Sequence, residues 1–177
     1  MKMIKFAAAC VLVLLVSACV AQSNPYQMEF AGSKLSFRSN LDRAKDVMLS
    51  DGEAAKALLL DPGIPTIILA YVPDNATNGF YTVAGYELSY KLTLAHQAYF
   101  GSAPDIKGVA LNTTEEAYAM ATIDVPVILM KAGSDRTAVT VDGDVIIVEG
   151  KDMTENGRDY TDLDLAADRL LLEILKV

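Results

Sequence analysis

The alternation of hydrophobic and polar positions predicts two β-hairpins, one near each end of the chain. Residues 26–40, YQMEFAGSKLSFRSN, carry apolar side chains at alternate positions on both sides of Gly32 and Ser33, which we interpret as a turn. Residues 137–150, TAVTVDGDVIIVEG, show the same alternation around Asp142 and Gly143, a pair suited to a tight turn. Each segment is therefore expected to form an antiparallel pair of strands.

Continuous apolar runs predict further strands in the middle of the chain. Residues 66–72, TIILAYV, and 125–133, VPVILMKAG, are runs of the kind found in strands that are covered on both faces. Residues 106–111 and a short segment around residues 47–49 are also expected to be strands. Parallel strands among these would need helical crossovers between them.

Apolar residues at helical spacing predict the helices that would form those crossovers. Helices are predicted at residues 52–60, 79–100 and 114–121, and an amphipathic helix closes the chain within residues 160–177. The longest helix places one apolar stripe at helical spacing, formed by Tyr81, Ala84, Leu88, Leu92, Ala95 and Tyr99. The order of elements predicts an α/β fold, a single-domain layered sandwich over residues 26–177, with a mixed sheet and antiparallel hairpins at its edges.

The first 18 residues have the order of a secretory signal peptide. Lys2 and Lys5 precede an apolar run that begins at Phe6, and small residues follow at Ser17 and Ala18. The run is shorter than the roughly 20 apolar residues that a membrane-crossing helix needs. We therefore expect cleavage rather than a retained membrane span, which is the alternative.

Cys19 follows the small residues directly. The sequence VSAC, residues 16–19, resembles the lipobox of bacterial and archaeal lipoproteins. The resemblance implies cleavage before Cys19, two hydrocarbon chains on its sulfur, and a short tether over residues 19–25. Two chains hold a protein stably in a membrane, whereas one chain holds it only marginally. An ordinary signal peptide with an incidental cysteine is the alternative. Cys10 would leave with the leader, so no disulfide is expected.

The charge of the chain excludes one class of partner. The formal net charge is −8, and removal of residues 1–18 takes away two of 15 basic residues and none of 23 acidic ones, which gives −10. An acidic surface without a basic cluster repels nucleic acid. Nucleic-acid binding is therefore excluded.

The chain contains few candidates for catalysis or metal binding. His96 is the only histidine, so a multi-histidine metal site is excluded, and we interpret this residue as a buried structural side chain. The hairpin turn accounts for Asp142 and Asp144 better than a calcium loop does. No nucleophile elbow, zinc-binding helix, dinucleotide fingerprint or phosphate loop occurs in the chain. We therefore expect no catalytic residue, no cofactor and no metal; a non-enzymatic protein is favoured, and an enzyme is the open alternative.

Two acidic or ionic segments have competing interpretations. Four aspartates, Asp159, Asp162, Asp164 and Asp168, surround the start of the last helix. We interpret them as stabilising the helix dipole, with Thr161 and Asp164 as a capping box and a cation site as the alternative. KAGSDR, residues 131–136, follows a predicted buried strand, and a loop there with Lys131, Ser134 and Arg136 would bind an anion. A plain polar connection is the alternative.

Asn75 and Asn112 begin the sequons NAT and NTT in predicted loops. Each is a candidate for N-glycosylation. Asn112 has a second interpretation as a helix cap, in front of a predicted capping box formed by Thr113 or Thr114 with Glu116.

Several segments together resemble a group of small uncharacterised archaeal lipoproteins and secreted proteins. They are FRSNLDRA (37–44), YELSYKLT (86–93), PVILM (126–130), TAVTVDGDVIIVEGKD (137–152) and DLDLAADRLLL (162–172). The resemblance spans most of the domain and implies an extracytoplasmic, lipid-anchored protein without a known activity. The segment GKDMTENGRDYTD, residues 150–162, is longer than that group leads us to expect.

We therefore expect a lipid-anchored protein on the extracytoplasmic face of the cell membrane, with a binding or cell-surface interaction domain. Its expected partners are membrane lipid, through Cys19, and an unidentified cell-surface protein. One alternative is a small-ligand or anion-binding lipoprotein that uses the loop at residues 131–136. The other is a hydrolase that depends on carboxylates brought together by the fold.

Overall fold

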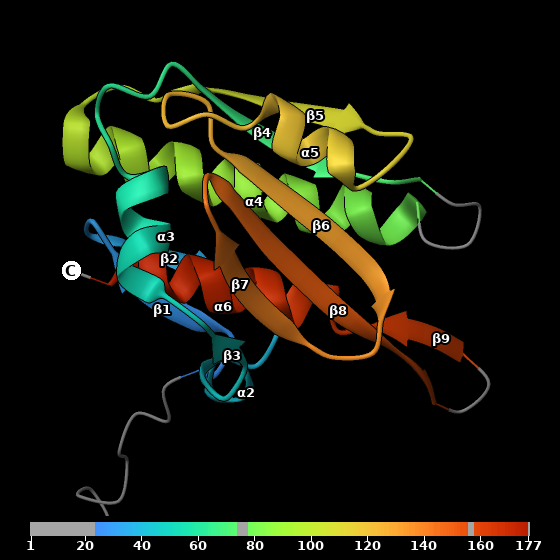
Figure 1. Cartoon of the computed structure of the whole chain (residues 1–177). Helices are drawn as coiled ribbons and strands as arrows, with labels where there is room; N and C mark the ends of the chain where they lie inside the picture. The colour runs from blue at the N-terminus through green and yellow to red at the C-terminus, as the bar shows by residue number, and fades with distance from the viewer. Residues whose placement is uncertain (1–23, 74–77, 156–157, 177) are drawn as a thin grey trace, which may run out of the picture.

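A mixed β-sheet forms the centre of the protein, and the α/β class expected from the sequence is confirmed. The computed structural model describes residues 24–73, 78–155 and 158–176. The sheet has seven strands in the order β3-β7-β8-β6-β4-β5, with β9 paired to the far end of β8 (Figure 1). The strands are β3 (Met48–Leu49), β4 (Thr66–Tyr71), β5 (Asp105–Ala110), β6 (Val127–Ser134), β7 (Ala138–Asp142), β8 (Val145–Glu155) and β9 (Arg158–Thr161).

Strand direction divides the sheet into two parts. Strands β5, β4, β6 and β8 are parallel, and the apolar runs of residues 66–72 and 125–133 had indicated buried strands at β4 and β6. Strand β7 is antiparallel to β8, and β3 runs parallel to β7. The helices of Asn78–Phe100 and Glu115–Met120 supply the crossovers from β4 to β5 and from β5 to β6, whereas β7 connects β6 to β8.

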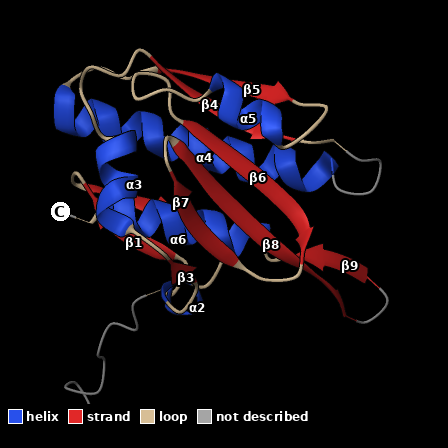
Figure 2. Ribbon diagram, viewed as in Figure 1, coloured by secondary structure: helices blue, strands red, loops and turns tan. Residues whose placement is uncertain are grey.

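The two faces of the sheet are covered unequally (Figure 2). One face packs in the larger core against α4 (Asn78–Phe100) and α6 (Leu163–Leu175), together with α2 (Leu41–Lys45) and α3 (Gly52–Leu59). The other face carries a smaller core beneath the short helix α5 (Glu115–Met120). Among the described elements, α5 is the helix that covers this second face.

The longest helix shows why its residues form that element. The apolar stripe predicted along α4 faces the core: Tyr81, Ala84, Leu88, Leu92 and Ala95 are buried, and Tyr99 is half-buried. In the last helix, Leu163, Ala166, Leu170 and Ile174 are buried as expected, whereas Val177 lies outside the described residues. These two helices pack against each other across the core.

The N-terminal hairpin is a two-stranded sheet of its own, formed by β1 (Gln27–Phe30) and β2 (Ser33–Ser36). Its turn is centred on Ala31 and Gly32, one residue before the predicted pair, and both residues have positive φ, at 48° and 76°. The hairpin buries Phe30 and Leu35, and the Phe30 ring meets the Tyr99 ring edge-on at 5.6 Å. The hairpin therefore lies outside the main sheet, whose end strands are β3 and β5.

The C-terminal hairpin has the predicted turn, with Gly143 at φ 59°. Its strand β8 continues to Glu155 and then pairs with β9, with Asp152 opposite Thr161. Residues 150–162, which looked long for a connection, therefore contain the end of β8 and its antiparallel partner β9. In the described part of the chain, no helix has both the length and the hydropathy needed to cross a bilayer.

Candidate functional site

Several residues predicted from the sequence lie outside the described structure. These are Cys19 with the whole leader, and the sequon residue Asn75. The second sequon residue, Asn112, is exposed just before α5. Its backbone N–H and its side-chain amide both donate to Glu116, at 3.0 and 3.2 Å. The side chain of Thr114 makes no capping bond, so the predicted capping box is wrong and Asn112 holds Glu116 instead.

His96 has the structural role expected of it. The side chain is buried, and Nε2 lies 2.5 Å from the carbonyl oxygen of Leu59. Its ring meets Phe100 at 5.4 Å between centroids. The imidazole thereby joins α4 to the end of α3.

Asp162, Asp164 and Asp168 form no common site with a third ligand, and the side chain of Asp159 lies outside the described part of the structure. Asp162 accepts from the Thr137 hydroxyl at 3.1 Å, and Asp164 lies 3.7 Å from Arg38. The Thr161 hydroxyl accepts from the N–H of Leu163, so the predicted Thr161–Asp164 capping box is also wrong. Among the described residues no group of three potential ligands is close enough to hold a metal ion.

Asp168 belongs to a buried polar cluster that the sequence did not indicate. Its carboxylate accepts from the N–H of Ser39 at 2.8 Å. Burial raises the pKa of Asp168 to about 6, against the opposing effect of the hydrogen bonds from Ser39. Nearby, Lys91 is only 1% exposed, pairs with Glu87 one turn earlier, and lies 4.4 Å above the Phe37 ring. The cluster fastens the segment after β2 onto α4 and α6.

The residues of the predicted anion site come together in a hollow of about 440 Å³, which we call the ionic hollow. It is lined by Lys131, Ala132, Gly133, Ser134, Asp135, Arg136 and Glu149. Residues 131–134 are the end of β6 rather than a loop, because the strand continues its pairing with β8 up to Ser134.

The cations of the ionic hollow are already partnered. Glu149 is 7% exposed, and its two carboxylate oxygens lie 3.3 Å from Lys131 Nζ and 2.8 Å from Arg136 Nε. Asp135 adds a second negative charge to the lining. The formal charges of the lining residues therefore cancel, and an entering anion gains no net attraction from them. Anion binding by Lys131, Ser134 and Arg136 stays a prediction.

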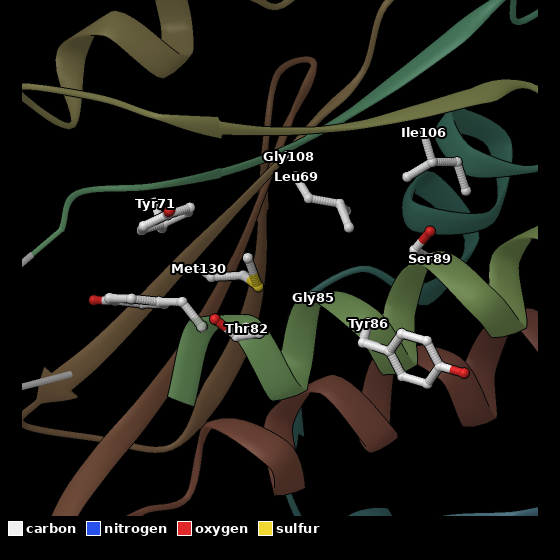
Figure 3. A pocket seen from close by; sticks show the side chains of 10 residues that line it. Leu69, Tyr71, Thr82, Gly85, Tyr86, Ser89, Ile106, Gly108 and Met130 are labelled. Carbon is white, nitrogen blue, oxygen red and sulfur yellow. The ribbon is translucent and has the colours of Figure 1, made fainter. Parts of the chain in front are cut away.

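A different hollow lies where α4 passes over the edge of the sheet (Figure 3). We call it the α4–β5 groove; its volume is about 300 Å³. The sheet contributes Leu69, Tyr71, Ile106, Gly108 and Met130, and the helix contributes Tyr81, Thr82, Gly85, Tyr86 and Ser89. None of these described lining residues is charged. The floor is apolar, and hydroxyl groups stand on the helix side and at one end.

Tyrosines shape this groove. The rings of Tyr71 and Tyr81 stack at 4.9 Å, and the Tyr81 hydroxyl accepts from the N–H of Ala132 at 3.1 Å, which fixes both rings. Tyr86 stacks on Tyr90 at 6.2 Å and remains 68% exposed at the mouth. Rigid rings at one end and an exposed ring at the mouth are typical of sites that receive a ligand or a partner side chain.

The groove could not be predicted from the sequence, because the residues that line it are far apart in the chain. Strands β4 and β5 supply two lining residues each, β6 supplies one, and the first half of α4 supplies five. One local signal was present: Gly85 interrupts a helix that is otherwise rich in good helix formers. No protein-family model, no curated protein and no solved structure matches the chain, so this geometry is the basis for assigning a function.

Proposed function

We propose that the protein is a lipid-anchored binding protein on the extracytoplasmic face of the cell membrane. Cys19 carries the lipid, and the folded domain binds a cell-surface partner through the α4–β5 groove. The order of basic, apolar and small residues before Cys19 supports the anchor. The resemblance to archaeal lipoproteins points the same way.

The α4–β5 groove is the observation that carries the binding role. Its apolar floor gains free energy when it is covered, and its hydroxyl groups can orient a ligand. No charged side chain among the described lining residues would have to be desolvated on binding. The lining also holds no carboxylate or histidine for general acid–base chemistry. Binding without catalysis fits this set of residues.

The anchor is tested by the intact mass of the protein extracted from membranes of its native host. Cleavage before Cys19 and the added mass of two hydrocarbon chains are expected. Cys19→Ala should release the protein from the membrane fraction, whereas Cys10→Ala, inside the leader, should leave it there. Retention of residues 1–18 would contradict the proposal.

The binding role is tested with phenol as a small uncharged ligand. Phenol should shift the NMR signals of Tyr71 and Tyr86 at millimolar concentration. Gly85→Leu places a side chain in the groove and should abolish the shifts. Gly79→Leu is the matched control, because a Cβ there meets no neighbouring atom. Shifts that are equal in both variants would count against the groove.

A second candidate function, anion binding, is favoured by the convergence of Lys131, Ser134 and Arg136 on one hollow. Glu149 opposes it by occupying both cations. Glu149→Gln should therefore raise the affinity for inorganic phosphate, measured by titration calorimetry, if the hollow is an anion site. A carboxylate-dependent hydrolase, the third alternative, needs two carboxyl groups facing each other across a cleft.

A further inference from the structure

Strand β5 has one unpaired edge. Among the described strands it pairs only with β4, and it is the last strand of the sheet. Asp105 donates to Pro65 at 3.0 Å, and Leu111 donates to Tyr71 at 2.8 Å. Because backbone direction alternates along a strand, the N–H and C=O groups of Ile106, Gly108 and Ala110 point away from β4. These groups form a row that another strand can pair with.

The unpaired edge and the α4–β5 groove are adjacent. Ile106 and Gly108 belong both to the outward-pointing row and to the lining of the groove. The absence of a side chain at Gly108 leaves the space beside it open, since a Cβ there would meet no atom within 4 Å. Gly85, on the facing side of α4, also has no side chain that would occupy the hollow. A strand added to β5 would therefore place a side chain at the hollow.

We propose that the α4–β5 groove receives an extended segment of a partner protein, which pairs with β5 as an additional strand. One apolar side chain of the segment enters the hollow, and alternate residues point away from it. This inference rests on the proposed binding role and names the kind of partner. The volume of about 300 Å³ is at the lower end for small-molecule pockets, and it suits a single side chain.

Charge defines the partner segment further. The described groove lining is uncharged, and the exposed charges of β5, Asp105 and Lys107, pair with each other at 3.1 Å. The whole chain carries a formal charge of −8. The segment should thus be uncharged where it pairs and basic at its flanks. A second copy of this chain would bring the same negative charge, which disfavours self-pairing.

The test uses peptides of nine residues, selected from a random display library against the detergent-extracted protein. Selected peptides should alternate apolar residues, lack Asp and Glu, and carry Lys or Arg at their ends. Binding should slow hydrogen exchange at the amides of Ile106, Gly108 and Ala110. Exchange at the amides that already donate to β4 should change less.

Backbone variants separate strand pairing from simple filling of the hollow. Ala110→Pro removes one outward N–H at a residue that does not line the hollow, and proline is tolerated at an edge position whose N–H faces solvent. This variant should weaken peptide binding at least tenfold and leave phenol binding in place. Ala110→Ser, which keeps the N–H, is the matched control and should weaken peptide binding less.

A measurement on the peptide does not depend on how that variant folds. N-methylation of alternate peptide amides should abolish binding for one set of positions and spare the other, because only one edge of an added strand faces β5. Equal effects of both sets, or no selected peptide while phenol still binds, would overturn strand pairing and leave the binding role standing. A concentration-dependent dimer with protected β5 amides would overturn it in favour of self-pairing.

Discussion

The ionic hollow and the α4–β5 groove differ in how their polar groups are satisfied. In the ionic hollow, Glu149 binds both Lys131 and Arg136, so the charged side chains complete one another within the fold. In the groove the lining is uncharged, and it is the backbone edge of β5 that lacks a strand partner among the described residues. The charged residues that the sequence suggested as a site thus pair with each other, whereas β5, which the sequence did not single out, offers unpaired backbone groups among the described strands.

The largest effect is expected from a pair of glycine substitutions, one on each side of this comparison. Gly150 follows Glu149 on β8, and a Cβ there would overlap the backbone nitrogen and Cα of Leu163 at the start of α6. Because backbone atoms cannot yield as a side-chain end can, Gly150→Ala should lower the free energy of unfolding by about 4 kcal/mol. Gly108→Ala, in open space, should change it by less than about 1 kcal/mol. Urea unfolding curves give both values; equal losses would contradict the close packing of α6 on β8.

Removal of both cations tests how much the ion pairs of Glu149 with Lys131 and Arg136 stabilise the fold. Lys131→Ala or Arg136→Ala alone should cost about 1 kcal/mol, because each side chain is partly exposed, at 39% and 57%. The double variant leaves the buried Glu149 without a cation and should cost about 3 kcal/mol, more than the sum of the single losses. Thermal unfolding of the four proteins measures this coupling. Lys107→Ala, in the exposed pair of β5, is the control and should have almost no effect.

Asp168 provides a second buried carboxylate for comparison with Glu149. Its pKa of about 6 in the folded protein is above its ordinary value of 3.8, so the folded state binds the proton more tightly than the unfolded state does. This group therefore lowers stability as the pH rises from about 4 to about 6, by about 2 to 3 kcal/mol in total. Asp168→Asn should remove that part of the pH dependence, as measured by urea unfolding between pH 4 and pH 7. An unchanged profile would show that Asp168 titrates normally.

The smallest effect on stability is expected at the mouth of the groove. Tyr86 is 68% exposed, so Tyr86→Ala should change the free energy of unfolding by less than about 0.5 kcal/mol. The same variant should weaken phenol binding about threefold, because it removes an aromatic wall. Tyr118→Ala, at an exposed tyrosine on α5 outside the groove, should leave phenol binding unchanged. Equal phenol affinity in both variants would place the ligand elsewhere.

The sequence predicted those parts of the fold that depend on local pattern. The turn at Gly143, the buried strands β4 and β6, and the buried stripe of α4 all follow from residues that are close in the chain. Glu87 and Lys91 have the i,i+4 spacing of a helical ion pair, and they form one. That Lys91 is almost fully buried could not be foreseen, because Phe37 covers it from a distant segment.

The candidate site was less predictable than the fold. The convergence of Lys131 and Arg136 followed from their place at the end of a strand, but their neutralisation by Glu149 depends on the pairing of β6 with β8. The groove depends on strand order, which places β5 outermost, and strand order cannot be read from hydrophobic patterns. Both features depend on pairing between strands that are distant in the sequence, and for that reason neither was predicted.

In the proposed lipid-anchored form, the position of the first described residue limits the distance between the domain and the membrane. The carbonyl of Asn24 accepts from the N–H of Gln27 at the start of β1, and Figure 1 shows α2 in the lower part of the view and β5 at the top. With Cys19 held in the membrane, the five peptide units up to Asn24 reach at most roughly 18 Å. In the lipid-anchored form that we propose, the domain lies close to the lipid headgroups, and a neighbouring protein in the same envelope can approach β5.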